Sequence, residues 1–116
     1  MSTPKPNTIS DMEEDALALG EIYKDLASLR AKVDRVTSKA AKLAAYEHAN
    51  GIQQAGEEHQ RLIELKENIN ESRKAIRIVR SASKKGKISA SRLEQACAQG
   101  SEALETARDT LADIGL

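Results

Sequence analysis

Aromatic residues are nearly absent from this chain of 116 residues, which has two tyrosines and neither phenylalanine nor tryptophan. Large aromatic side chains normally supply much of the apolar contact area in cores and interfaces. Leu, Ile and Val together number only 23, which is close to the share below which chains tend to be disordered. The net charge of zero argues against a self-repelling coil. We therefore expect a fold with a thin core, which burial of further apolar surface in an oligomer would relieve.

Cysteine and long apolar runs are also scarce. Cys97 is the only cysteine, so an intrachain disulfide is excluded and a reducing cytosol is the expected location. No histidine lies near Cys97 in the sequence, which favours a small apolar core residue over a nucleophile. The opening MSTPKPNTIS lacks an apolar signal region, and no stretch approaches the ~20 apolar residues of a membrane span. We expect a cytoplasmic protein that does not enter a membrane.

The chain divides into a short arm and one helical domain. Pro4 and Pro6 disfavour a helix at the start, so residues 1–10 are expected to form a flexible N-terminal arm. Residues 11–116 are enough for one domain and too few for two ordinary ones. Strand signals are missing, and the apolar residues recur at helical spacing. The expected fold class is therefore all-α.

The first helix is expected over about 11–49. Ser10 and Glu13 have the spacing of a capping box at its start. Apolar residues then recur at steps of three and four for over four heptads, which predicts a packed, coiled-coil-like seam. The positions of this seam are Met12, Leu19, Ile22, Leu26, Leu29, Val33, Val36, Ala40 and Leu43.

A tight turn is expected at Asn50-Gly51, because both residue types tolerate the left-handed conformation that ends helices. The second helix would then run back along the first over about 52–82. Its expected seam contains Ala55, Leu62, Leu65, Ile69, Ser72, Ile76 and Val79. If the helix absorbed both Gly51 and Gly56, the alternative would be one continuous helix through residue 82.

Gly86 marks a second break, and a third helix is expected over about 90–115, capped by Ser89 or Ser91. Small residues at Gly100 and Ala107 would allow a close approach to neighbouring backbones. The seam contains Leu93, Cys97, Gly100, Leu104, Ala107, Leu111 and Ile114. The complete expectation is a long antiparallel helical hairpin with a third helix packed back on it, a three-helix bundle that self-associates. In general architecture this resembles spectrin-like bundles, a likeness of fold that says little about function.

Charge is segregated along the chain. Residues 11–25 are mainly acidic, whereas residues 72–93 hold eight basic residues and no acid. A hairpin brings these two stretches together, so Arg73, Arg77 and Arg80 are expected to pair mainly with the acidic start of the first helix. Because exposed ion pairs are each worth only about 0 to 1 kcal/mol, this match would stabilise the hairpin collectively.

The remaining cations are the candidate anion-binding or nucleic-acid-binding surface of a basic segment, residues 73–92. They are Lys74, Lys84, Lys85, Lys87 and Arg92. Lys84, Lys85 and Lys87 are expected to face solvent in the loop before the third helix. Base stacking usually recruits aromatic rings, which this chain lacks, so binding would be directed to the phosphate backbone and would weaken steeply with salt.

Sequence motifs for catalysis or cofactor binding are not apparent. His48 and His59 flank the expected turn, but neither has an acid three residues before it, as a metal site of the helical-bundle type requires. No Gly-x-Ser-x-Gly motif or phosphate-cradling loop occurs. We therefore expect no catalytic residue, no metal and no cofactor.

The leading functional hypothesis is a non-enzymatic helical protein-protein interaction module, such as a scaffold, adaptor, chaperone or phage-type assembly protein. It would act through coiled-coil-like packing with a second copy or a helical partner. Apolar residues at the overhang of the first helix or beside the seams are the candidate oligomer interface: Met12, Leu17, Leu19, Ile63 and Ile78. The alternative hypothesis is an accessory nucleic-acid-binding protein that uses the basic segment.

Overall fold

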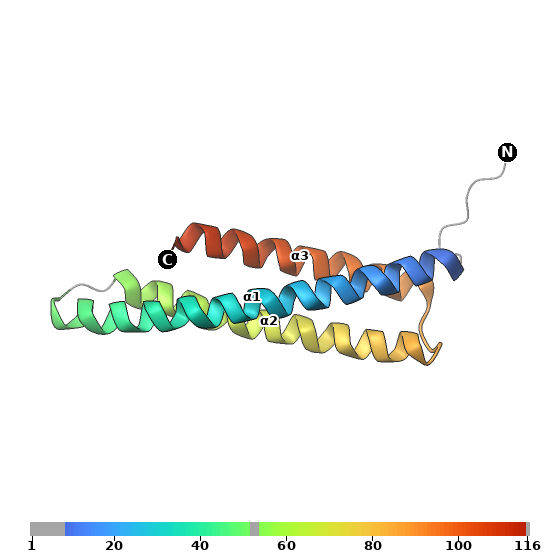
Figure 1. The fold of residues 1–116 in the computed structure, drawn as a ribbon, viewed down its shortest axis with the longest axis horizontal. Helices are drawn as coiled ribbons and strands as arrows, with labels where there is room; N and C mark the ends of the chain where they lie inside the picture. The colour runs from blue at the N-terminus through green and yellow to red at the C-terminus, as the bar shows by residue number, and fades with distance from the viewer. Residues whose placement is uncertain (1–8, 52–53, 116) are drawn as a thin grey trace.

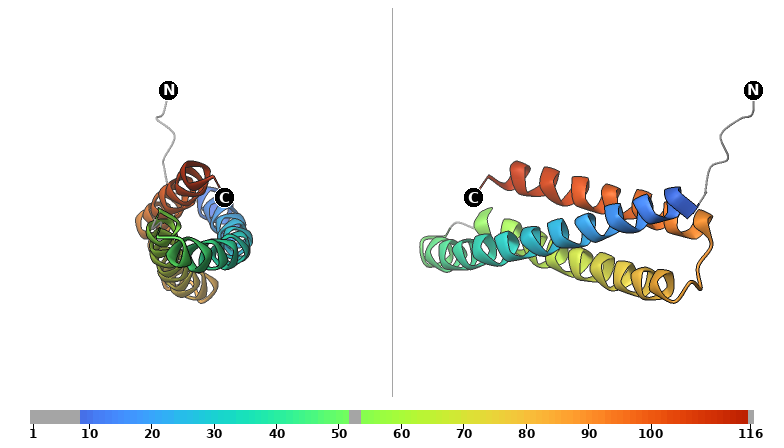
Figure 2. Two further views of the ribbon diagram at one scale, coloured as in Figure 1. Left: turned by 90° about the vertical axis from the view of Figure 1, so that its left-hand side faces the viewer. Right: turned by 45° about the vertical axis from the view of Figure 1, so that its right-hand side comes forward.

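The computed structural model describes residues 9–51 and 54–115, and these form an elongated bundle of helices (Figure 1). The elements are α1 (Ile9–Ala49), α2 (Gln54–Lys84) and α3 (Ala90–Ile114). Each helix contacts the other two, and seen from the end they surround a common axis (Figure 2). The principal extents are 69 × 30 × 16 Å. The predicted all-α, three-helix bundle is confirmed, and the described residues contain no strand.

The predicted turn after α1 is confirmed. Gly51 has a φ of 77°, in the left-handed region that glycine adopts without steric cost. The Asn50 amide nitrogen Nδ2 donates a 2.8 Å hydrogen bond to the carbonyl oxygen of Tyr46, which satisfies one of the last helical carbonyls. The chain reverses, and α2 runs back along α1 (Figure 1). This hairpin excludes the alternative of one continuous helix.

The second connection, between α2 and α3, has well-defined caps. Gly86 has a φ of 66°, and the backbone N–H of Lys87 donates to the carbonyl oxygen of Ala82 at 2.9 Å, as in a Schellman motif. Ser89 is the N-cap of α3, and its Oγ accepts a 3.1 Å hydrogen bond from the Arg92 N–H. Of the two serines predicted as alternatives, Ser89 is therefore the cap and Ser91 lies within the helix.

Helix boundaries differ from the predicted ones by up to two residues. α1 starts at Ile9, so Ser10 lies inside the helix rather than capping it. α2 is displaced by two residues toward the C-terminus, at Gln54–Lys84 rather than about 52–82. Most of the expected N-terminal arm, residues 1–8, lies outside the described residues, as do residues 52 and 53.

The core is formed mainly by residues of the predicted seams, with Ala96 in addition, whereas Ser72 is only half-buried and the predicted Ala55 lies outside the described side chains. Its buried members are Leu19, Ile22, Leu26, Val33, Val36, Ala40, Leu62, Leu65, Ile69, Ile76, Val79, Leu93, Ala96, Leu104, Ala107, Leu111 and Ile114. Met12, Leu29 and Cys97 are partly buried against them. Leu43 is the main departure, because 40% of its surface is exposed. Its position agrees with the heptad spacing, but α3 ends before reaching this part of α1 (Figure 1).

The helices pack tightly at Gly100, which is buried. A Cβ atom at this position would lie 2.9 Å from Cγ2 of Ile22 in α1 and 3.3 Å from Cδ1 of Ile76 in α2. Real Cβ atoms essentially never come within 3.0 Å of another heavy atom, so only glycine fits without a shift. The predicted close approach at Gly100 is confirmed.

Candidate interaction surface

A largely apolar groove of about 440 Å³ lies where α1 begins, α2 ends and α3 begins. We call it the end groove. Its lining residues are Glu13, Ala16, Leu17, Leu19, Arg80, Ser83, Lys84 and Leu93. Leu19 and Leu93 belong to the core and have no exposed surface, whereas Leu17 is 74% exposed. The groove therefore extends from core residues to the exposed side chain of Leu17.

Small residues on α1 leave room for this groove. Ala16 contributes only a methyl group to its wall. One turn further along α1, a Cβ atom at Gly20 would lie 3.6 Å from Nη2 of Arg80. The Arg80 side chain therefore extends across α1 close to its backbone. The narrow α1 surface lets a long cationic side chain reach over from α2.

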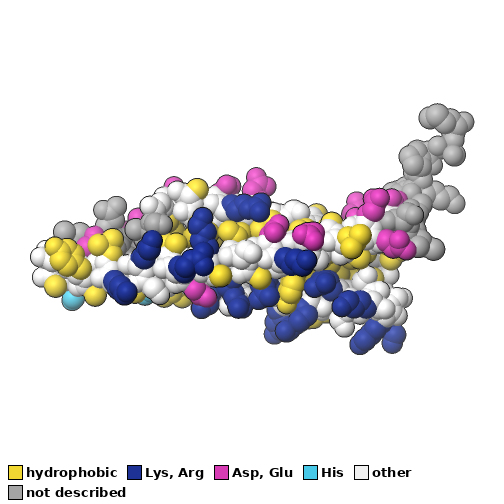
Figure 3. All heavy atoms as spheres, in the orientation of Figure 1, with side chains coloured by type: hydrophobic (Ala, Val, Ile, Leu, Met, Phe, Trp, Pro, Cys, Tyr) yellow, Lys and Arg dark blue, Asp and Glu magenta, His cyan; other side chains and the backbone are white. Residues whose placement is uncertain are grey.

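Acidic and basic side chains lie on opposite sides of the end groove. Exposed Glu13 lines the groove from α1, and exposed Glu14 follows it in the same helix; these two form its acidic side. Arg80 and the exposed Lys84 line the groove from α2 and form its basic side. Figure 3 shows magenta side chains gathered over the start of α1 and dark blue ones over the end of α2, with apolar atoms between them. The predicted juxtaposition of the two stretches is confirmed, since Glu13, Arg80 and Lys84 line one groove.

The arginines expected to pair with the acidic start of α1 make different contacts. The guanidinium carbon of Arg73 lies 4.6 Å from the centroid of the Tyr23 ring, and that of Arg80 lies 5.3 Å from it. Among the described residues, neither of these arginines nor the exposed Arg77 forms an ion pair with a carboxylate. The prediction of arginine–carboxylate pairs is therefore wrong. Tyr23 is partly buried against the core, and its ring face attracts cations more strongly where water is excluded.

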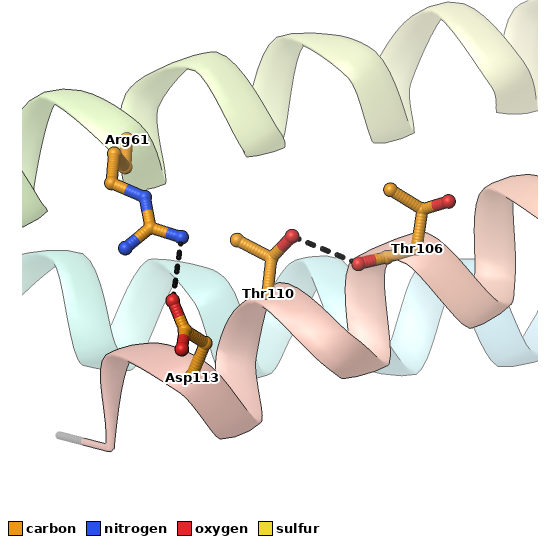
Figure 4. A network of polar contacts seen from close by, with 4 residues as sticks. All are labelled: Arg61, Thr106, Thr110 and Asp113. Atoms are coloured by element: carbon orange, nitrogen blue, oxygen red, sulfur yellow. Dashed lines mark hydrogen bonds and ion pairs between the residues drawn. The ribbon is translucent and has the colours of Figure 1, made fainter.

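Ion pairs between the helices are found elsewhere. Lys66 of α2 pairs with Asp34 of α1 at 2.7 Å, and Arg108 of α3 lies 3.9 Å from Asp25 of α1. Arg61 of α2 donates to Asp113 of α3 at 3.0 Å, beside the Thr110 hydroxyl, which donates to a carbonyl within α3 (Figure 4). These pairs are partly exposed, and each is worth about 0 to 1 kcal/mol.

The candidate anion-binding cations lie on the surface. Lys74, Lys84, Lys85, Lys87 and Arg92 are all exposed, and within the described part of the chain none of them forms an ion pair. The prediction that the three lysines around Gly86 face solvent is confirmed. Their charge is available to an external anion.

The candidate oligomer interface is only partly on the surface. Leu17 and Ile78 are 74% and 60% exposed, and Ile63 is half-buried. Met12 packs partly buried against the core. Leu19 is 0% exposed, so it is a core residue, as its place in the predicted seam indicated, and its assignment to the interface was wrong. The first turns of α1 do not form the predicted overhang, because residues of α1, α2 and α3 meet there around one groove.

Two exposed apolar residues near the turn were not predicted. Leu43 and Tyr46 are 40% and 67% exposed. The expected helix lengths could have predicted this exposure. At 1.5 Å per residue, a third helix of about 25 residues is too short to cover a first helix of about 39 residues.

Cys97 is a half-buried thiol whose Sγ donates a 3.2 Å hydrogen bond to the carbonyl oxygen of Asp15. Burial raises the pKa of this thiol, and the nearby carboxylates of Asp15 and Glu94 raise it further. A raised pKa disfavours the reactive thiolate at neutral pH.

His48 is exposed and His59 is half-buried. In the part of the chain that the structure describes, no three or more His, Cys, Asp or Glu side chains are grouped to hold a metal ion. None of its helices combines the length and the hydropathy that crossing a membrane requires.

Comparison of the chain with protein-family models, with curated proteins and with solved structures finds no match.

Proposed function

We propose that this protein is a non-enzymatic helical interaction module that binds another protein at the end groove. The observation that carries the proposal is the exposed side chain of Leu17 beside an apolar groove whose floor is the core itself. Single exposed leucines are common on protein surfaces. An exposed leucine beside an apolar groove is a better indication of a binding site than a single exposed leucine, because one partner helix can bury the leucine and fill the groove.

The energetic argument favours helix packing. Burying a leucine side chain completely is worth about 1.5–3 kcal/mol, and filling the groove would also remove the surface of Ala16 from water. Charged residues on both sides of the groove supply the polar rim that surrounds the apolar centre of an interface. The single half-buried cysteine suits a module that acts in a reducing cytosol.

Site-specific photo-crosslinking tests this function. A photoreactive phenylalanine analogue at position 17, in the full chain expressed in its native cells, is expected to form adducts with one protein species. The same analogue at Glu105, an exposed residue of α3, is the matched control and should form far fewer. Adducts of equal yield at both positions, or no adduct at position 17, would overturn the proposal.

Nucleic-acid binding is the second candidate function, supported by the five exposed cations of the basic segment. Binding of duplex and single-stranded DNA and RNA would be titrated at two salt concentrations. We expect affinity to fall steeply with salt and to be lost when Lys84, Lys85 and Lys87 are changed together to Glu. Melting should change little, because these lysines face solvent. Absence of binding at low salt would dismiss this candidate.

A further inference from the structure

We infer that the protein that occupies the end groove is a second copy of this chain. Two copies pack about a two-fold axis parallel to the long axis of the bundle, and Leu17 of each copy enters the end groove of the other. This inference rests on the proposed function and names its partner.

The apolar part of the surface is self-complementary. A two-fold interface uses the same patch on both subunits, so one patch must offer both a protruding group and a hollow that receives it. Leu17 protrudes, with 74% of its surface exposed, and the adjoining groove of about 440 Å³ reaches down to Leu19 and Leu93. Both halves of the contact are therefore present on one copy.

The charges are self-complementary as well, and they fix the direction of the axis. The acidic side lies on α1 and the basic side on α2, and these two helices pack alongside each other. Rotation about an axis parallel to the bundle places the α1 side of one copy against the α2 side of the other, so acids face bases. An axis in the interface but perpendicular to the bundle would place acids against acids, which is unfavourable.

The other exposed large apolar residues do not adjoin an apolar groove that has acids on one side and bases on the other. Leu43 and Tyr46 lie near the turn between α1 and α2, and Ile78 lies on α2 between exposed Lys74 and Lys85. None of these three lines the end groove. Tyr46, which is nearly as exposed as Leu17, is therefore a matched control for mutations of the groove.

Charge reversal provides a test that unfolding cannot imitate. In the proposed dimer, Glu13 of one copy faces Lys84 of the other, twice. Glu13→Lys alone and Lys84→Glu alone should each weaken self-association about tenfold, because both contacts become like-charged. An equimolar mixture of the two variants should associate about as tightly as the unmodified protein, since each contact again joins opposite charges. Sedimentation equilibrium at low salt measures the dissociation constants of the two single variants and of their mixture.

The apolar contact is tested by Leu17→Asp, which should weaken self-association about a hundredfold, whereas Tyr46→Asp should leave it unchanged. Circular dichroism of both variants should show the helical bundle intact.

A monomer at every concentration, or a mixture of charge variants no tighter than either variant alone, overturns the second copy as partner. Photo-crosslinking at position 17 then separates the two proposals. An adduct with a different protein would support the proposed interaction function and contradict only the proposed self-association. The absence of any adduct would contradict both proposals.

Discussion

The middle of α1 and its last two turns have similar apolar spacing but different burial. Leu26 and Val33, in the middle, have no exposed surface, whereas Leu43 and Tyr46 are 40% and 67% exposed. Both α2 and α3 cover the middle of α1, but α3 ends before the turn, and only α2 continues beside α1 (Figures 1 and 2). Heptad spacing thus selects the face of α1 that packs, and the third helix decides how completely that face is buried.

The largest effect that separates these two regions should come from leucine truncation. Leu26→Ala is expected to lower the free energy of unfolding by about 2–5 kcal/mol, because it leaves a cavity in a fully packed layer. Leu43→Ala should cost less than about 1 kcal/mol, since its side chain already contacts water. Urea denaturation of the two variants measures the difference, and equal costs would contradict the role assigned to α3.

Replacing a glycine with alanine should lower the free energy of unfolding in the packed middle of the bundle and raise it near the turn between α1 and α2. Gly100→Ala is expected to destabilise the protein by about 1–3 kcal/mol, because the new Cβ would overlap Cγ2 of Ile22, which branches near the backbone and moves little. Gly56→Ala, near the turn, meets nothing within 4 Å and should stabilise α2 by up to about 1 kcal/mol. Thermal melting compares the two variants. Stabilisation by Gly100→Ala would show that the neighbouring side chains can move to accommodate the added methyl group.

A smaller effect is expected at the cap of α3, which starts the coverage of α1. Ser89→Ala should lower stability by about 1 kcal/mol, because Oγ no longer accepts from the Arg92 N–H. Ser91→Ala is the control, since Ser91 is exposed within the helix, and should change stability by less than about 0.5 kcal/mol. The same loss from both variants would count against Ser89 as the cap.

The smallest effect concerns Cys97, which lies in the part of α3 that packs on α1. Its pKa is raised in the folded protein, so its contribution to stability is complete below the thiol pKa of the unfolded chain and is lost as pH rises through the folded value. Alkylation at neutral pH should be slower than for a cysteine introduced at the exposed Ala45 in a Cys97→Ser background. Mass spectrometry follows both reactions, and equal rates would contradict the shift.

Much of the candidate site followed from the sequence, with exceptions that have a common cause. The exposure of Leu17 and Ile78 and of the cations around Gly86 was predicted, because charge and periodicity depend on residues close in the chain. The stacking of Arg73 and Arg80 on Tyr23 was missed, since it depends on how α1 and α2 are rotated about their axes. Leu19 is buried as its place in the predicted seam indicated, and only its additional assignment to the oligomer interface was wrong.

Local chemistry determined the three helices and their order. Heptad spacing fixed the packed faces, Asn50-Gly51 and Gly86 ended two helices, and Ser89 capped the third, because these effects act within a few residues. The tertiary structure alone decided how the helix ends meet. It left Leu43 uncovered, opened a groove beside Leu17 and brought acids of α1 beside bases of α2. Such features arise from the lengths and relative rotations of packed helices, which join residues far apart in the chain.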